Sequence, residues 1–485
     1  MKTKLIFFGI VLITLILYLP SFTVFYTNDD FFLLKISQAN NISEFMNFFN
    51  FTKGPDGLGM YRPLTIQVFY FLAHSLFNLN PFPMHVVVFI VFTLLLYSIF
   101  LLSRKLFGYL KVKSKDNPSL LVVFLYAVSA THFGHLYYLA TFQEVAMTFF
   151  SVVCIYYYLN YLDKKNITSI FLSLMMFVLA LLSKENAVVI PGLLFSTYLF
   201  RQIAVKDKIV LVNVVKHLAP FAILLSIYLY FHVFVYGLAT GDSYVWDFSI
   251  RKILNTLSWY LLWSFNIPEM FVDFVGPGLK INPNLMKYWA DETTEIVLGF
   301  LIIVLTMGIV FIKTKISKQF LSLLLFSGMG FVVSLVPVLF LPIHKFTFYL
   351  TLPLIWVTVL LAYSLAQRDK LLITIFIIVW LNTSYISLNL TNKTHWITRG
   401  QEIAQKVNKY ISKNLPDLEE KSLMFVDAYE DISLPWSPTE NVKTALSNQN
   451  YFDVFFPKQF ITITYNETGD EIIPNAIYSR QFLGY

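Results

Sequence analysis

Two adjacent aspartates follow the first apolar stretch of the chain, in the sequence TNDDFFLL at residues 27–34. Two further acids, Glu144 and Glu185, also stand where apolar stretches begin or end. A carboxylate at such a boundary can take a proton from a hydroxyl group or bind a divalent cation. Asp29, Asp30, Glu144 and Glu185 are therefore candidates for acid–base chemistry.

Cationic and histidine side chains recur at the same boundaries. They are Arg62, His132, His135, Lys184, His344 and Lys345. Positive side chains can hold a phosphate group and neutralise the charge that develops on it when it leaves. Together with the acids, they predict one mixed acidic and basic site.

Each acid also has an ordinary structural explanation. Asp29 and Asp30 can cap the helix that follows them, because acids are favoured in a first helical turn. Lys184 and Glu185 are neighbours in the sequence and can simply form a turn between two helices. The functional interpretation therefore depends on whether these residues meet in space.

The histidines and Lys345 have ordinary explanations as well. His132 and His135 stand three residues apart, and this spacing without the helical pair of a zincin is a weak metal signal. Histidines at the membrane interface are the simpler interpretation. Lys345 can extend its side chain to water as an anchor at a helix end.

The composition places these residues in a membrane protein. Of the 485 residues, 57% are hydrophobic and 13% are charged, whereas roughly a quarter are charged in soluble domains. The single cysteine, Cys154, excludes a disulfide within one chain. Apolar runs long enough for a bilayer recur through residues 1–391. The predicted spans are 5–26, 84–103, 118–132, 141–162, 167–182, 186–201, 210–237, 294–312, 320–340, 347–366 and 371–391.

Positive charge orients these predicted spans. When the ambiguous apolar stretches 63–79 and 250–266 lie flat on the outer surface, the short loops assigned to the cytoplasm hold most Lys and Arg residues of positions 1–391. This distribution satisfies the positive-inside rule. We therefore predict about 11 transmembrane helices in a cell membrane, with a cytoplasmic N-terminus and an extracytoplasmic C-terminus.

A second pattern supports a surface position for the stretch 63–79. On a helix that begins at Pro63, the side chains of Gln67, His74 and Asn78 fall on one side. A polar stripe on an apolar helix suits a helix that lies at an interface. The first outer loop, 27–83, is thus predicted to contain two surface helices.

The last part of the chain differs in composition from the rest. Residues 392–485 contain a polar helix-like stretch at 396–413 and two strand-like runs, SLMFVDA at 422–428 and QFITITY at 459–465. We predict a small extracytoplasmic α/β domain here. The fold class is thus an all-α polytopic membrane domain over residues 1–391, followed by this small domain.

The order of these motifs resembles that of the GT-C class of membrane glycosyltransferases, which use polyprenyl-phosphate sugars. The chain is similar to the branch that contains protein O-mannosyltransferases and the tetratricopeptide-repeat mannosyltransferases. The stretches that carry the resemblance are NDD at 28–30, YRPLT at 61–65, LNPFPMH at 79–85, THFGH at 131–135, TFQE at 141–144, LLSKENAVVIP at 181–191 and HKFTFYLTLP at 344–353.

The resemblance implies a role for the acids of the first outer loop. In that family the loop carries two membrane-parallel helices, and an acid early in the loop acts as general base or positions the acceptor. This role falls on Asp29, with Asp30 the less expected of the two. Arg62 matches the family's R-P-L motif, and Glu144 matches its acidic position at the start of the fourth span.

The resemblance also implies a set of residues that bind the substrate and its phosphate. Lys184 and Glu185 match a K-E pair beside the lipid phosphate, and Lys345 stands where relatives often have an arginine. A lysine there gives up bidentate phosphate geometry. The whole predicted set is Arg62, His132, His135, Glu144, Lys184, Glu185, His344 and Lys345.

The sequence departs from the tetratricopeptide branch in two further respects. HFGHLY at 132–137 replaces the H-P-x-H-x-E pattern of that branch, and the C-terminal part has no helical repeats. The sugar and the acceptor, which can be a protein, a glycan or a lipid, therefore stay open.

The predicted reaction is an inverting transfer of a sugar from a polyprenyl-phosphate donor to a hydroxyl group on the extracytoplasmic face. It requires no cofactor, although Asp29 and Glu144 leave room for Mg²⁺ or Mn²⁺. One alternative is a polysaccharide polymerase or ligase that uses polyprenyl diphosphate, and such enzymes depend on arginine-rich outer loops. Another is a lipid-linked-sugar flippase or transporter, which should carry charges or broken helices at mid-membrane. No nucleic-acid motif occurs.

Overall fold

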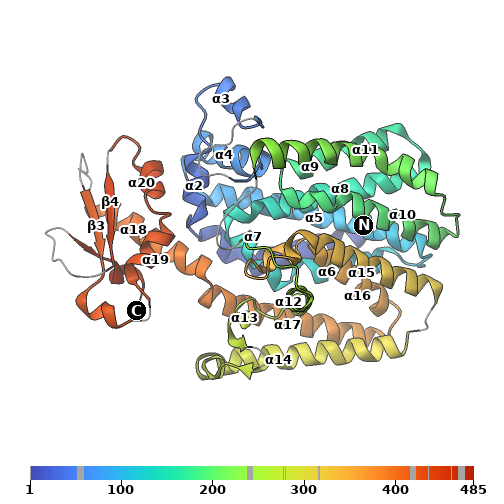
Figure 1. Ribbon diagram of the computed structural model, residues 1–485. Coiled ribbons are helices and arrows are strands. Elements are labelled where there is room, and N and C mark those ends of the chain that lie inside the picture. Colours follow the sequence, from blue (N-terminus) through green and yellow to red (C-terminus); the bar gives the residue numbers. More distant parts are fainter. Residues whose placement is uncertain are drawn as a thin grey trace.

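A bundle of long helices makes up most of the molecule, and a small unit of strands and helices from the C-terminal part lies at one end of it (Figure 1). The computed structural model describes residues 2–51, 59–237, 244–276, 278, 280–314, 317–414, 422–434, 436–459, 461–467 and 476–484.

Within these residues, eight helices are long and apolar enough to cross a membrane. A helix is what long apolar runs form in lipid, because it satisfies its own backbone hydrogen bonds. Four of the eight include a helical turn that adjoins the α-helix: Lys2–Thr23 with α1 (Lys2–Tyr18), Leu139–Lys164 with α8 (Phe142–Lys164), Glu185–Val205 with α10 (Ile190–Val205) and Leu211–Tyr236 with α11 (Leu211–Tyr230). The other four are α5 (Pro81–Tyr109), α14 (Pro283–Ile312), α15 (Lys318–Leu339) and α17 (Lys370–Thr394). All eight coincide with predicted spans, which agrees with the expected all-α polytopic membrane protein.

The other three predicted spans take different forms. The stretch 118–132 lies on α6 (Asp116–Ala127), which turns by 52° into the segment Ala130–Tyr137 and is a ninth span only if this bent pair counts as one. The remaining two are α9 (Ile167–Leu181) and α16 (Pro353–Leu365). At 15 and 13 residues, they are shorter than the roughly 20 residues that a crossing needs.

Small residues allow the helices of the bundle to approach one another closely. A Cβ atom built on Gly330 of α15 would lie 2.8 Å from the ring of Trp356 in α16. The same ring donates its N–H to the Ser334 hydroxyl over 3.1 Å. Small residues at helix contacts are typical of membrane proteins, where association relies on close packing and hydrogen bonds between helices.

Residues 27–83, the predicted first outer loop, carry three short helices in their described part. They are α2 (Asp29–Lys35), α3 (Ile42–Asn47) and α4 (Phe69–Ser75), and a π-helical turn at Leu64–Val68 leads into α4. Of the predicted polar stripe, Asn78 lies beyond α4 and is exposed, whereas the other two side chains face the protein. Gln67 is buried, and His74 Nε2 lies 2.8 Å from the carbonyl oxygen of Leu34 in α2. The stripe therefore attaches α4 to its neighbour.

The segment after α11 carries the second predicted surface helix, α12 (Ile250–Trp263). Its polar side chains Arg251, Asn255 and Ser258 are exposed, whereas Trp259 and Trp263 are buried. The tryptophans join an apolar cluster with residues of α15. The helix α13 (Phe271–Phe274) and an antiparallel pair, β1 (Val275–Gly276) and β2 (Lys280–Ile281), follow.

The C-terminal part forms a parallel three-stranded sheet with helices beside it. The strands β3 (Ser422–Val426) and β4 (Thr462–Asn466) fall in the two predicted runs, and β5 (Ile477–Tyr478) completes the order β4-β3-β5. The helices are α18 (Trp396–Asn414), α19 (Pro438–Ala445) and α20 (Asn450–Phe455). A domain boundary at residue 392 stays a prediction.

This C-terminal part contacts the first outer loop through α2. The Asn28 N–H donates to the Ala445 carbonyl over 3.0 Å, and Lys35 Nζ lies 2.7 Å from Asp453 Oδ2. The contact places the end of α19 directly beside Asp29.

Candidate functional site

The two adjacent aspartates have different environments. Asp30 is fully buried, accepts a hydrogen bond from the Tyr70 hydroxyl over 2.5 Å and accepts another from the Thr27 N–H over 3.0 Å. Burial raises the pKa of its carboxyl to about 7, against the lowering effect of these two donors, and the charge of Asp29 adds to the increase. Asp30 thus connects α2 to α4.

Asp29 is the exposed member of the pair. The protein that surrounds its carboxyl raises its pKa, whereas a hydrogen bond from Tyr138 and the positive charge of Arg62 lower it, and the net change is an increase. A carboxylate in this state is accessible to a substrate and is a stronger base than an ordinary aspartate. The structure therefore separates the pair into an accessible acid and a structural one.

The backbone just before Asp29 is strained. Asn28 has φ +47° and ψ −119°, a conformation that residues with a side chain rarely adopt. Such positions cost about 1–3 kcal/mol each and concentrate at functional sites. The hydrogen bond from Asn28 to Ala445 helps to hold this conformation and fixes the place where Asp29 emerges.

Arg62 forms a two-pronged ion pair with Glu185. Its Nε donates to Glu185 Oε2 over 2.6 Å, its Nη2 donates to Oε1 of the same carboxylate, and its Nη1 donates to Gln143 Oε1 over 2.8 Å. Bidentate pairs of this kind fix the guanidinium plane as well as its position. Arg62 is almost completely buried, whereas the Glu185 side chain keeps 31% of its surface exposed.

The segment that carries Arg62 is attached to the turn before α10. The Leu64 N–H donates to the carbonyl of Leu182 over 3.2 Å, and the Thr65 hydroxyl donates to the carbonyl of Ser183. These bonds join the YRPLT and LLSKENAVVIP stretches, which are more than a hundred residues apart in the sequence. Backbone contacts therefore set the distance between Arg62 and Glu185.

Lys184 and Glu144 form a second ion pair next to the first. Lys184 Nζ lies 2.5 Å from Glu144 Oε1, and the side chains are 3% and 2% exposed. Lys184 Nζ also lies 4.7 Å from the centre of the Tyr349 ring, within the range of a cation–π interaction. Both members of the pair are thus held on several sides.

His344 belongs to this site, but its neighbour Lys345 points elsewhere. The His344 ring lies 4.5 Å from the ring of Tyr244. Burial and then the positive charges of Lys184 and Arg62 lower the pKa of His344 to about 4, so its ring is neutral at pH 7. Lys345 Nζ instead lies 3.4 Å from Asn255 Oδ1 on α12.

The histidine pair predicted at the membrane interface is inside the protein. His132 and His135 are buried, and His132 Nδ1 lies 2.8 Å from His135 Nε2. The other ring nitrogen of His132 lies 2.7 Å from the Tyr126 carbonyl, and His135 Nδ1 lies 3.4 Å from the Thr351 hydroxyl. The bend after α6 turns the pair inward, where it supports the segment before α16. No group of three His, Cys, Asp or Glu side chains in the described residues is placed to hold a metal ion.

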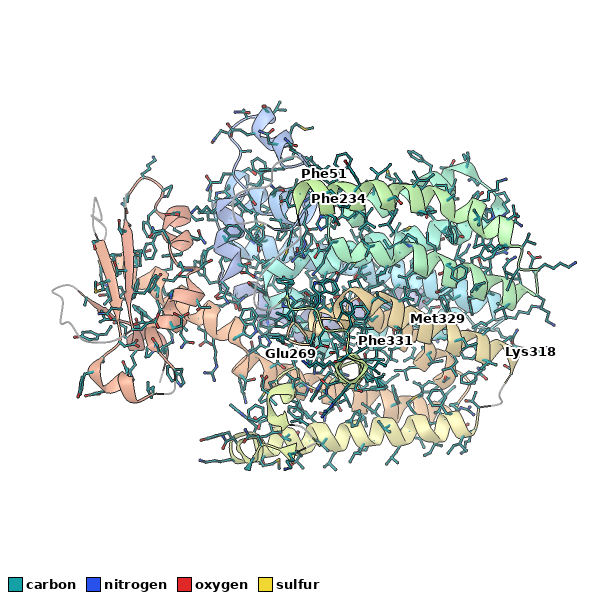
Figure 2. The ribbon with its side chains drawn as sticks, viewed as in Figure 1. Phe51, Phe234, Glu269, Lys318, Met329 and Phe331 are labelled. Atoms are coloured by element: carbon teal, nitrogen blue, oxygen red, sulfur yellow. The ribbon has the colours of Figure 1, made fainter. Side chains whose placement is uncertain are left out.

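A largely enclosed carboxylate that sequence reasoning missed lies beside the same segment. Glu269 accepts hydrogen bonds from the Thr347 N–H over 2.6 Å and from the Thr347 hydroxyl over 2.7 Å, and it lies 3.2 Å from His395 Nε2 (Figure 2). Burial alone would raise the pKa of Glu269, but the His395 and Thr347 contacts bring it below its usual value. An isolated acid in an apolar stretch was its only sequence signal.

The outer residues named above converge on one region. The Tyr244 hydroxyl interacts electrostatically with Arg62, Glu185 and Asp29, which come from three segments far apart in the sequence. Glu144, Lys184 and His344 adjoin the same region through the ion pair and the charges on His344. Four of the predicted residues surround this region without contributing an accessible charge to it: Asp30, Lys345, His132 and His135.

No known family, curated protein or solved structure matches this chain. The chemistry proposed below therefore rests on the arrangement of the side chains and on the resemblance of the motifs. The arrangement consists of an accessible carboxylate, two cations paired with carboxylates and a neutral histidine. It can accept a proton on one side and bind an anion on the other.

Proposed function

We propose that the protein is an inverting glycosyltransferase of GT-C type that moves a sugar from a polyprenyl phosphate to an acceptor hydroxyl on the extracytoplasmic face of the cell membrane. The observation that carries the proposal is the exposed Asp29 carboxylate within electrostatic range of Arg62, among long apolar helices. A lipid-linked donor needs this combination, because its chain lies in the bilayer and its phosphate lies at the boundary.

Asp29 is the proposed general base. It is accessible, its backbone is fixed by the contact with Ala445, and its pKa is raised above that of an ordinary aspartate. A base works best when its pKa approaches the working pH, because it then holds the proton more firmly while staying mostly ionised. Asp30 is occupied by Tyr70 and Thr27 and positions the helix on which Asp29 lies.

Arg62 is the proposed phosphate ligand, and Glu185 holds its place in the absence of donor. The two ion pairs carry no net charge, because the cations Arg62 and Lys184 are balanced by Glu144 and Glu185. Since His344 is neutral as well, a phosphate can bind here only if one of the two cations is freed from its carboxylate. Glu185 is the more exposed of the two carboxylates, whereas Glu144 is buried against Lys184. The donor phosphate therefore displaces Glu185 from Arg62, and the Lys184–Glu144 pair stays in place.

The reaction is a single displacement at the anomeric carbon. The acceptor oxygen forms a bond to this carbon while its proton passes to Asp29. The bond between the carbon and the phosphate oxygen breaks, and its electron pair leaves on the phosphate. Arg62, with the positive charge of Lys184 nearby, neutralises the charge that develops there. Because a cation-bound phosphate is already a fair leaving group, the proposed reaction needs no metal ion.

The test is sugar release from a panel of labelled polyprenyl-phosphate sugars by the purified protein in lipid nanodiscs. We expect one donor to be turned over, and Asp29→Asn to slow that turnover by about 10²–10⁴-fold without a change in donor binding. Asp291→Asn, an exposed acid on α14, is the matched control and should keep full activity. EDTA should leave turnover unchanged.

Three outcomes contradict the proposal. Full activity of a correctly folded Asp29→Asn variant would show that Asp29 is not the general base. If no polyprenyl-phosphate sugar is turned over but polyprenyl-diphosphate donors are, the protein would be a polymerase or ligase. If no sugar is released but the intact lipid is transported, the protein would be a flippase.

A further inference from the structure

A cavity of about 920 Å³ lies between α1, α6 and α17, away from the site described above. Most of its wall is apolar, with Ile10 and Ile13 from α1, Leu121 and Phe124 from α6, and Ile373 from α17. Pockets that bind small molecules are typically of this size and are mainly apolar, with a few polar groups at defined points.

The polar groups of this cavity are positively charged. Lys113, Arg368 and Lys370 line it, and no Asp or Glu is among its lining residues. Two acids are near the lining residues in the sequence. Asp369, between Arg368 and Lys370, is exposed and does not line the cavity, and Asp116 is paired with Arg104 at 2.7 Å. Within the part of the chain that the structure describes, neither Lys113 nor Lys370 forms an ion pair. The cavity therefore combines an apolar wall with uncompensated positive charge.

One of these cations is held rigidly in place. Arg368 donates from Nη2 to the Val310 carbonyl over 2.9 Å and from Nη1 to the Lys313 carbonyl over 3.1 Å, at the end of α14. Its Nε, which is buried, has no hydrogen-bond partner among the described residues. An anion next to Arg368 would meet a fixed donor group as well as two exposed lysines.

The positive end of the cavity lies far from Asp29. The 29 residues of α5 separate the loop that carries Lys113 from the outer segment before Pro81, a distance of about 43 Å at 1.5 Å per residue. Arg368 contacts the end of α14, next to the start of α15 at Lys318, which Figure 2 shows far along the bundle from Glu269. A ligand at this cavity is therefore not the sugar donor in reaction.

We propose that the cavity binds an anionic phospholipid, with an acyl chain between α1 and α17 and the phosphate between Lys113, Arg368 and Lys370. The occupant is a lipid because the wall is apolar and two of its three helices, α1 and α17, belong to spans that are long enough for a membrane. It is an anionic lipid because the lining has three cations and no acid. Basic pockets between membrane helices bind the headgroups of such lipids.

A substitution in the apolar part of the cavity provides a second, independent test. Gly9 of α1 lines the cavity, and a Cβ atom built on it meets no other atom within 4 Å. Gly9→Leu therefore adds volume inside the acyl-chain path without a clash in the protein. It leaves the three cations unchanged.

The experiment is native mass spectrometry of the purified protein titrated with phosphatidylglycerol or with phosphatidylcholine of the same chains. We expect phosphatidylglycerol to bind more tightly, and Lys113→Gln/Lys370→Gln to weaken it by roughly ten- to thirtyfold. Gly9→Leu should reduce binding of both lipids. Inorganic phosphate should not compete, because it lacks the chain.

The control pair is Lys115→Gln/Lys208→Gln, which removes the same charge from two exposed lysines that do not line the cavity. It should bind phosphatidylglycerol as the wild type does. Equal losses in the two double variants, or equal binding of the two lipids, would falsify the proposal and reduce the cations to general membrane anchors. Because the readout is lipid binding, it does not depend on the proposed enzymatic activity.

Discussion

Lys184 Nζ and Glu144 Oε1 lie 2.5 Å apart in an almost fully buried ion pair that joins α8 to the turn before α10. Each charge compensates the other, and neither has enough water around it to stand alone. This pair also keeps a cation beside the region that Asp29 and Arg62 share. Its structural role and the chemical role that we propose for its cation can be separated by mutation.

We expect Lys184→Met and Glu144→Gln to reduce the free energy of unfolding by about 3–5 kcal/mol each, because each leaves a buried charge without its partner. The double variant Lys184→Met/Glu144→Leu should recover most of the stability and yet turn over no sugar. Unfolding in detergent micelles measures the first effect. Lys35→Gln, which removes an exposed pair with Asp453, should cost less than about 1 kcal/mol. Single variants as stable as the control would contradict the prediction.

Asp30 predicts a pH dependence of stability. Its pKa is about 7 in the folded protein and about 3.9 in an unfolded chain. Between these two pH values Asp30 is protonated in the folded protein and ionised in the unfolded chain. The contribution of Asp30 to the free energy of unfolding is therefore complete below about pH 4 and is lost as the pH rises through 7. We expect the wild type to unfold a few degrees higher at pH 5 than at pH 8.

Asp30→Asn should reduce this difference, because an amide resembles the protonated acid and does not titrate. Glu295→Gln, which changes an exposed acid on α14, serves as the control and should keep the wild-type dependence. A variant Asp30→Asn with an unchanged pH dependence would show that other groups cause it.

The proposed exchange of Glu185 for phosphate at Arg62 predicts opposite effects for the two residues. Glu185→Gln should tighten donor binding severalfold, because the competing carboxylate is gone. Arg62→Lys should weaken donor binding by about tenfold or more, because a lysine cannot reproduce the two-pronged contact. Equilibrium binding of a non-transferable donor analogue measures both. Weaker binding in Glu185→Gln would instead make Glu185 a ligand of the substrate.

Lys345 is expected to matter little for the phosphate, contrary to what the motif alone implies. Its amine contacts Asn255 on α12, outside the group formed by Arg62 and Lys184. We expect Lys345→Gln to change donor affinity by no more than about twofold, in line with other exposed or half-exposed charges. Lys184→Gln, measured in parallel, should show a much larger loss. Equal losses of donor affinity in the two variants would show that Lys345 contributes to phosphate binding.

The sequence predicted the long helices well, because length and apolar composition decide whether a segment can cross a membrane. It did not predict the form of three apolar stretches. α6 turns by 52° into the next segment, and α9 and α16 have only 15 and 13 residues, features that apolar runs alone do not reveal. The inward position of His132 and His135 is a consequence of that turn.

The pairing inside the site was also beyond sequence reasoning. Lys184 and Glu185 are adjacent and suggest a pair with each other, but the backbone at Lys184 is extended, with φ −162° and ψ 140°. Successive side chains of an extended segment point to opposite sides, so Lys184 reaches Glu144 and Glu185 reaches Arg62. Glu269 was missed because its partners, Thr347 and His395, are 78 and 126 residues away.

The contact between Asn28 and Ala445 has a consequence for the acceptor. If Asp29 is the base, the acceptor hydroxyl must reach it beside the end of α19, which belongs to a part of the chain far from Asp29 in sequence. The size and shape of the molecules admitted would then depend on the turn after Ala445, and the chemistry would depend on the membrane helices. Acceptor preference could thus change between related proteins by substitutions in that turn alone, while the donor and the reaction stay the same.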